Sequence, residues 1–156
     1  MFQNYKIYPY ETLPSTNQTA MEMAANGAPE WTVVVAKHQS AGRGRLQRKF
    51  YSPGGTGVYM SIILRPQIAS GEALKITTAA AVSVAETLEA MFGVRAEIKW
   101  VNDILLDGKK VCGILTESRL SGTELDFAVL GIGINLAMPE GGFPEEIKEI
   151  AGVVAE

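Results

Sequence analysis

The 156-residue sequence predicts an α+β protein with a mixed, largely antiparallel sheet and helices packed on one face of it. Three observations indicate this class. Short apolar segments separated by turn signals fill the second half of the chain, which is typical of a hairpin-rich sheet. Residues 72–92 repeat apolar side chains at helical spacing. The helical segments are segregated from the hairpin-rich part, which argues against a doubly wound α/β arrangement.

The first helix is predicted over residues 15–26. Pro14 ends the extended segment before it, and Ser15 or Thr16 can supply the N-cap. Gly27 stands where a helix C-terminus commonly has glycine. The Ser-Thr-Asn start of this helix is read first as a cap, although hydroxyls and an amide at a helix N-terminus could also bind a polar ligand.

Two β-branched strands are predicted over residues 31–37 and 58–64. A long helix follows over residues 72–92, with Ser70 as its cap and Gly93 as its C-terminal glycine. Its apolar stripe is expected to lie in the core and to carry no chemistry. The stripe consists of Leu74, Thr77, Ala81, Val84, Ala85, Leu88 and Met91.

From Glu97 onward the pattern predicts a meander of strands. The dipeptide Asp107–Gly108 suits a two-residue type I′ hairpin turn. The segments 111–118 and 125–134 are apolar enough to need cover on both faces, and the two helices are expected to cover one of them. A short helix is predicted to begin near Pro144.

A single domain over residues 1–156 is expected, because 47% of the residues are hydrophobic and a chain of this length can bury one core. The N-terminus lacks the apolar segment of a secretory signal, and no apolar run is long enough to span a bilayer. The single cysteine, Cys112, excludes an internal disulfide, and the single histidine, His38, excludes a histidine-rich metal site. We therefore expect a cytoplasmic protein without membrane contact.

Positive charge is concentrated in one segment of an otherwise acidic chain. Residues 31–71 contain six Lys or Arg and no Asp or Glu, a charge of +6, so with a net charge of −3 the remainder carries −9. Four of the six lie in residues 41–49, AGRGRLQRK, which we call the arginine loop. Arginine offers a planar fork of donors to carboxylate or phosphate, and glycine permits close approach to the backbone. The loop therefore predicts an anion site.

Two other interpretations of the arginine loop compete with this one: a solvated turn and a surface for the nucleic-acid backbone. A nucleic-acid surface normally extends a basic stripe over the domain, whereas the rest of this chain is acidic. The pattern therefore favours a small-anion pocket and no nucleic-acid partner. The loop matches neither the GxxxxGK[ST] phosphate loop nor the GxGxxG dinucleotide fingerprint.

Further polar candidates stand at the ends of predicted strands, namely Lys99, Asn102, Asp103, Lys110 and Asn135. Carboxylate and amide oxygens can hold Mg²⁺ or its waters, while an ammonium group balances phosphate charge. Taken singly, Lys99 and Asp103 are better interpreted as ordinary hairpin charges. Their combination with the arginine loop favours a magnesium-phosphate site.

Six segments of the chain, taken together in this order, resemble biotin-protein ligases. They are STN at 15–17, Gln39 with AGRGR at 41–45, RKFYSPGG at 48–55, KWVND at 99–103, KKVCGIL at 109–115 and GIGIN at 131–135. The resemblance covers nearly the whole chain. It implies the biotin–lipoate ligase catalytic fold, which is similar to class II synthetases, and a monofunctional enzyme. Such an enzyme uses MgATP to convert biotin to biotinoyl-5′-AMP and then acylates a lysine of a biotin carboxyl carrier protein.

The resemblance also implies roles for individual residues. For biotin these are Ser15, Thr16, Asn17, Gln39, Gly42, Arg43, Gly44, Arg45, Phe50, Lys110 and Gly113. For the nucleotide they are Arg43, Arg45, Arg48, Lys99, Asn102, Asp103 and Asn135, with Gly131 and Gly133 on the pocket floor. Asn102 and Asp103 would also hold Mg²⁺. The catalytic residues implied are Lys110, Arg45 and Arg48.

The chain departs from the family pattern at several points. Phe50 stands where the family usually has tryptophan, and Val101 stands where it has proline. The expected single domain lacks the family's C-terminal β-barrel domain and any N-terminal DNA-binding domain. We therefore expect apolar surface on strands 111–118 and 125–134 and self-association as a symmetric homodimer.

Two alternatives to an active biotin ligase remain open. One is a module that binds biotin or biotinoyl-AMP but transfers the biotinyl group poorly, because the C-terminal parts are missing. The other is a lipoate-type ligase, which shares this fold and chemistry. The GRGR and SPGG segments favour biotin over lipoate, because lipoate ligases typically carry a different arginine-loop signature.

Overall fold

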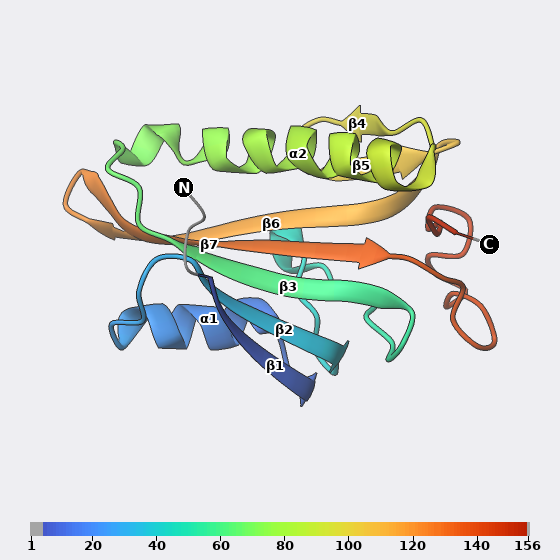
Figure 1. Ribbon diagram of the computed structural model, residues 1–156, viewed down its shortest axis with the longest axis horizontal. Coiled ribbons are helices and arrows are strands. Elements are labelled where there is room, and N and C mark those ends of the chain that lie inside the picture. Colours follow the sequence, from blue (N-terminus) through green and yellow to red (C-terminus); the bar gives the residue numbers. More distant parts are fainter. Residues whose placement is uncertain (1–4, 156) are drawn as a thin grey trace.

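Seven strands form one mixed sheet in the order β1-β2-β3-β7-β6-β5-β4 (Figure 1). The computed structural model describes residues 5–155; residues 1–4 and 156 of the predicted 1–156 domain lie outside this part. β1 and β2 pair in parallel through a helical crossover, and each other neighbouring pair in the described residues is antiparallel. The strands are β1 (Lys6–Leu13), β2 (Thr32–Gln39), β3 (Gly57–Leu64), β4 (Glu97–Lys99), β5 (Asp103–Leu106), β6 (Lys109–Ser121) and β7 (Glu124–Asn135).

The two α-helices, α1 (Thr16–Ala25) and α2 (Leu74–Phe92), cover opposite faces of the sheet (Figure 1). Side chains alternate along the central strand β7, so Phe127 and Val129 pack with α1 while Leu130 and Ile132 pack with α2. The predicted α+β class and the mixed, largely antiparallel sheet are confirmed. The expectation that both helices share one face is wrong, because β7 is apolar on both faces and each face needs its own cover.

The turn and cap residues at the ends of helices and strands confirm some of the expectations and contradict others. The type I′ turn is confirmed by positive φ at Asp107 (48°) and Gly108 (76°), and Gly93 ends α2 with φ of 67°. Ser70 does not cap α2 but begins a short 3₁₀ turn before it. Ser15 occupies the N-cap position of α1, yet its side chain makes no capping hydrogen bond.

The core stripe of α2 is confirmed at its centre and wrong at its ends, since Leu74 and Met91 are exposed. Near Pro144 the chain makes successive turns instead of the predicted helix. No helix in residues 5–155 is both long and apolar enough to cross a membrane.

The expected apolar patch on β6 and β7 is also wrong. Val111 and Ile114 are covered on the α2 face, and Phe127 and Val129 on the α1 face, all at 1% exposure or less. The reason given for a homodimer through these strands therefore disappears.

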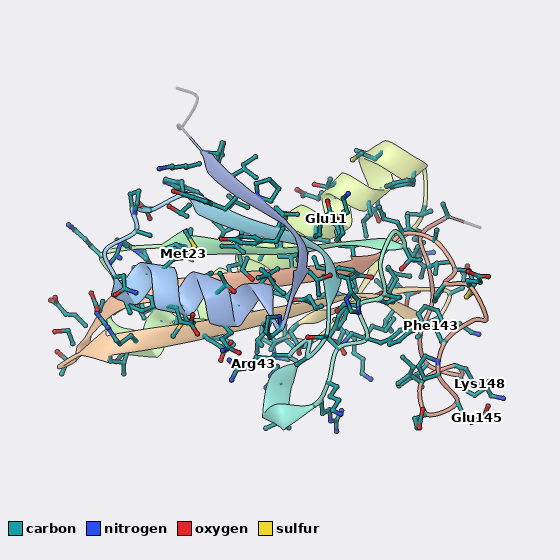
Figure 2. The ribbon with its side chains drawn as sticks, turned by 90° about the horizontal axis from the view of Figure 1, so that it is seen from below. Glu11, Met23, Arg43, Phe143, Glu145 and Lys148 are labelled. Atoms are coloured by element: carbon teal, nitrogen blue, oxygen red, sulfur yellow. The ribbon has the colours of Figure 1, made fainter. Side chains whose placement is uncertain are left out.

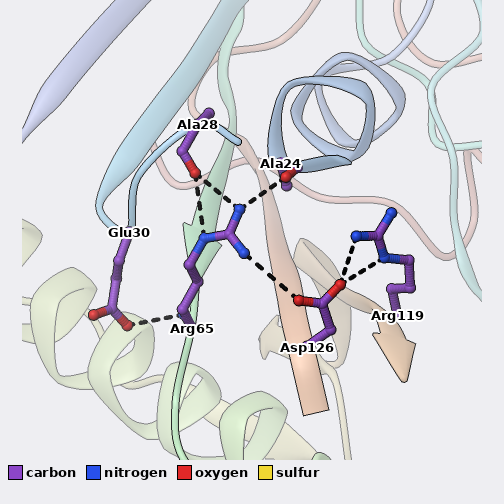
Figure 3. Close-up of polar contacts among 6 residues, drawn as sticks. All are labelled: Ala24, Ala28, Glu30, Arg65, Arg119 and Asp126. Carbon is purple, nitrogen blue, oxygen red and sulfur yellow. Dashed lines mark hydrogen bonds and ion pairs between the residues drawn. The ribbon is translucent and has the colours of Figure 1, made fainter. Parts of the chain in front are cut away.

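Arg65, which directly follows β3, ties the end of α1 to the sheet (Figure 3). Its Nη2 donates to the carbonyls of Ala24 at 2.8 Å and Ala28 at 3.0 Å, while Nη1 lies 3.8 Å from a carboxylate oxygen of Asp126. The backbone N–H of Arg65 donates to Glu30 at 2.9 Å. One guanidinium thus joins a carbonyl in the last turn of α1, that of Ala24, to a carbonyl in the following loop, that of Ala28.

We expect Arg65→Met to lower the free energy of unfolding by about 1–3 kcal/mol, because carbonyls at the end of α1 lose a charged donor. The matched control is Arg119→Met. Arg119 contacts the same Asp126 but is half exposed, so its loss should cost at most about 1 kcal/mol. Urea denaturation of both variants measures the difference. Equal destabilisation by the two substitutions would contradict this role for Arg65.

Candidate functional site

The floor of the candidate site is bare backbone on the α1 face of β6 and β7. Gly113 pairs with Gly133 across the two strands, and Gly131 follows on the same face. A Cβ at Gly133 would lie 2.5 Å from a ring carbon of Phe50, and one at Gly113 would lie 2.9 Å from the same ring. A Cβ at Gly131 would overlap the side-chain oxygen of Asn17. A side chain at any of these positions would therefore displace the Phe50 ring or the Asn17 amide.

The arginine loop is folded back on itself above this floor. The Phe50 amide donates to the Gly42 carbonyl at 2.9 Å, and the Gly44 amide donates to the Arg48 carbonyl at 2.8 Å. A Cβ at Gly42 would overlap the Phe50 carbonyl, so the lack of a side chain at this position lets the backbones of Gly42 and Phe50 lie close together. The loop thereby places the Phe50 ring on the floor and its arginines at the rim.

The space between loop and floor is a small cavity of about 40 Å³. Most of the residues predicted from the sequence line it. They are Ser15, Thr16, Asn17, Gln39, Arg43, Gly44, Arg45, Phe50, Asn102, Lys110, Gly113, Gly131 and Gly133. The structure thus brings together side chains from α1, β2, the arginine loop, β6 and β7.

Five of the predicted site residues do not line the cavity, namely Gly42, Arg48, Lys99, Asn135 and Asp103. Gly42 and Arg48 line an outer hollow on the other side of the loop, which Arg43 also reaches; Figure 2 shows Arg43 next to α1. Lys99 is exposed on the edge strand β4. Asn135 is buried at the end of β7 and donates to the Gly152 carbonyl at 3.1 Å. Asp103 contacts a cavity residue, as described below.

One wall of the cavity is a chain of buried polar groups. The side-chain oxygen of Gln39 accepts from the Thr16 backbone amide at 2.8 Å and from the Thr16 hydroxyl at 3.1 Å. The Gln39 amide nitrogen donates to Ser52 Oγ at 2.8 Å. Ser61 Oγ donates to Asn17 Oδ1 at 2.6 Å and lies 2.8 Å from Thr16 Oγ1. These bonds fix the orientation of each hydroxyl and amide group.

Ser61 and Ser52 are polar residues of this wall that the sequence analysis did not predict. The apolar lining residues Met60, Ile114, Leu115 and Ile132 were not predicted either. Ser61 is fully buried in β3, within the apolar run VYMSIIL. A lone serine facing the core of such a strand is itself a signal, because buried hydroxyls need hydrogen-bond partners.

The three cations that line the cavity, Lys110, Arg45 and Arg43, each have an acceptor within the chain. Lys110 Nζ lies 2.7 Å from Asp103 Oδ1, and Arg45 Nη1 donates to Asn102 Oδ1 at 2.9 Å. Arg43 Nη1 lies 3.3 Å from Glu117 Oε1. The acceptors hold the cations near one another, where an incoming anion could exchange for them.

Lys110 faces the cavity because of a β-bulge. Ile104 pairs with Cys112, but the next residue of β5, Leu105, pairs with Lys110, so β6 has one extra residue at this point. Regular alternation would place Lys110 on the same face as Cys112, which packs with α2. The extra residue turns Lys110 to the α1 face, where its ammonium lies over Gly113 and 5.8 Å from the Phe50 ring centroid.

Asn102 and Asp103 have the donor chemistry for a loosely held Mg²⁺. Asp103 provides a carboxylate and Asn102 an amide oxygen, both hard ligands at the rim. Asn102 Oδ1 accepts from Arg45 and Asp103 Oδ1 pairs with Lys110, so an ion would exchange for these cations. Within residues 5–155 no group of three or more His, Cys, Asp and Glu side chains converges. The pair therefore fits an ion that keeps most of its ligands from water and phosphate, as Mg²⁺ commonly does.

Cys112 is not available as a nucleophile. It is buried on the α2 face, and this burial raises the pKa of its thiol to about 12. The thiol therefore stays protonated at neutral pH. The arrangement as a whole suits binding of a polar head group and alignment of two anions, without a covalent enzyme intermediate.

Comparison with known proteins places most of the chain in one family. Residues 10–135 match the biotin/lipoate A/B protein ligase family. The bifunctional ligase/repressor BirA of Bacillus subtilis (strain 168) is 46% identical over 142 residues, covering 91% of this chain and 44% of that protein. The biotin–[acetyl-CoA-carboxylase] ligase of Paracoccus denitrificans is 39% identical over 135 residues, covering 84% of this chain and 55% of that protein.

A solved structure agrees as well. The biotin protein ligase from Aquifex aeolicus in complex with biotin and ATP has a TM-score of 0.74 and 34% identity, covering 96% of this chain and 59% of that chain. This chain spans about half the length of the curated relatives it matches. Since the family match extends over most of the sequence, the chain belongs to the biotin/lipoate A/B protein ligase family.

Proposed function

We propose that this chain activates biotin with MgATP and transfers the biotinyl group to a lysine of a biotin carboxyl carrier protein. One observation carries the proposal: an oriented polar wall and a set of cations meet over one glycine floor. The solved relative from Aquifex aeolicus, in complex with biotin and ATP, supports the choice of ligands. The single cysteine, Cys112, cannot form an internal disulfide, which fits a reducing compartment, and we expect the cytoplasm.

The polar wall would bind the ureido ring of biotin. A ureido group carries one carbonyl acceptor and two N–H donors, which match the hydroxyl groups of Ser15 and Thr16 and the amide of Gln39. The present cavity of about 40 Å³ holds little more than a water molecule. Biotin would therefore enter as the Phe50 ring and the arginine loop move off the floor, a loop rearrangement of the kind common on ligand binding.

The cations would serve the first chemical step. A carboxylate oxygen of biotin attacks the α-phosphorus of ATP, the bond to the β-phosphate oxygen breaks, and pyrophosphate leaves. Two anions must approach each other, so Lys110 and Arg45 would screen their repulsion and stabilise the charge that develops. Mg²⁺, held by Asn102 and Asp103 with phosphate oxygens, would neutralise charge on the polyphosphate.

The second step needs no further group from the floor. The neutral amine of the carrier lysine attacks the acyl carbon and loses a proton to water, so that an amide bond forms. The bond between the acyl carbon and the phosphate oxygen breaks, and AMP leaves with its electron pair. Because the leaving group is a phosphate monoester, the cations of the first step would stabilise it again.

Calorimetry with biotin, followed by biotin plus MgATP, tests the proposal directly. We expect biotin to bind alone and the mixture to yield biotinoyl-AMP and pyrophosphate by mass spectrometry, with a biotinylated carrier after its addition. Adenylate without a modified carrier would instead indicate the binding module. Preference for lipoate over biotin would indicate the lipoate-type ligase.

Lys110→Ala should slow adenylate formation by about 100-fold or more while changing biotin affinity much less. The reason is that the ammonium, fixed by the bulge and by Asp103, is aimed at charge that develops in the transition state. Lys109→Ala is the control, because Lys109 is exposed on the same strand outside the cavity. Equal losses of biotin affinity and adenylation rate would show that Lys110 contributes only uniform binding.

Arg45→Gly should leave the protein folded and speed dissociation of biotinoyl-AMP by about tenfold or more, through loss of a charge-assisted contact to phosphate. Arg45 is exposed in the arginine loop and its guanidinium donates to Asn102, so unfolding is not expected. Stopped-flow dissociation of the adenylate gives the rate, with the exposed Arg95→Gly as control. An unchanged off-rate would remove Arg45 from the site.

A further inference from the structure

Glu117 on β6 is the one carboxylate that contacts both the polar wall and the arginine loop among the described residues. Its Oε2 accepts from Asn17 Nδ2 at 2.9 Å, and its Oε1 lies 3.3 Å from Arg43 Nη1. The side chain is three-quarters buried, with 25% exposure. Both oxygens are therefore engaged, by elements that lie far apart in the sequence.

Glu117 is badly suited to touch the substrates itself. It lines the outer hollow behind the arginine loop and is not part of the inner cavity lining. A carboxylate would also repel the biotin carboxylate and the ATP phosphates. Its contacts with Asn17 and Arg43 indicate a role in positioning these two side chains.

One contact of Glu117 leads into the polar wall. Asn17 is buried over Gly131, and its Oδ1 accepts the hydrogen of Ser61. Ser61 Oγ in turn lies against the hydroxyl of Thr16. Asn17 Nδ2 donates to Glu117 Oε2 at 2.9 Å and to the Leu115 carbonyl at 3.3 Å, so Glu117 is the nearer of the two acceptors that set which way the amide faces. It thereby helps to fix the donor pattern as far as Thr16.

The other contact of Glu117 leads to the rim. Arg43 lines both the inner cavity and the outer hollow. Pairing with Glu117 anchors it, and with it the arginine loop, to β6. Because this ion pair is partly exposed, it contributes little to the stability of the fold, but it fixes the direction of the Arg43 side chain.

We propose that Glu117 is a positioning residue that links the polar wall to the arginine loop, through Asn17 on one side and Arg43 on the other. The effect of Glu117 on biotin binding rests on the proposed function. Its anchoring of the arginine loop can be measured without any ligand.

Two substitutions separate the two contacts. Glu117→Gln keeps an oxygen that accepts from Asn17 but loses the charge that holds Arg43, whereas Glu117→Ala loses both. The control is Glu86→Gln, which removes an exposed charge on α2. Hydrogen–deuterium exchange of the arginine-loop amides, without ligand, measures the anchor. Calorimetry with biotin measures the wall.

We expect loop exchange about two- to fivefold faster in both Glu117 variants and unchanged in the control. Biotin affinity should fall about three- to tenfold in Glu117→Ala and stay within about twofold of the parent in Glu117→Gln. Rescue by glutamine is the signature of positioning through Asn17. Equal losses of biotin affinity in the two variants, or unchanged loop exchange in both, would overturn the inference.

Arg43→Gln breaks the same ion pair from the other side and guards against a Glu117→Ala protein that fails to fold. It should speed loop exchange as much as Glu117→Gln does, and the double variant should add nothing further. Additive effects would show that the two side chains act separately. Failure of the proposed function looks different: the parent protein itself would show no biotin binding, while the exchange results would still decide the anchor.

Discussion

The Phe50 ring rests on the bare backbone of Gly113 and Gly133, and the Asn17 side chain occupies the space above Gly131. These contacts exist only because three strand positions carry no side chain. Methyl groups there would push the ring and the amide outward, and the arginine loop and the polar wall would move with them. A glycine in a strand usually weakens it, and it is retained where another group must approach closely. Here the approaching groups are the parts of the site itself.

The two faces of the sheet have different roles, one in the stability of the fold and the other in the candidate site. The α2 face carries the larger apolar cluster together with Cys112, and the site lies on the α1 face. β6 contributes to both, because the bulge between its pairings with Ile104 and Leu105 moves Lys110 from one face to the other. One inserted residue thus places an ammonium group beside Asp103 and Phe50.

Much of this could be predicted from local signals. A type I′ turn at Asp107–Gly108 needs positive φ, and the hairpin followed from it. The resemblance of six segments to biotin-protein ligases identified most of the cavity lining, whereas the arginine loop and KWVND alone supply only Arg43, Gly44, Arg45 and Asn102. The side on which each helix packs could not be predicted, because a strand apolar on both faces does not say which helix covers which. Ser61 was missed since its partners lie 44 and 45 residues away. The orientation of Lys110 depends on a pairing shift that its own segment does not encode.

The claim that bare strand backbone organises the site is tested most directly by Gly131→Ala, with biotin affinity measured by calorimetry. The added methyl would overlap the Asn17 side chain, whereas Gly71→Ala meets open space at ordinary φ and serves as control. We predict a folded Gly131→Ala protein that binds biotin about tenfold or more weakly, while the control binds as the parent does. Parent-like biotin affinity in folded Gly131→Ala would contradict the account.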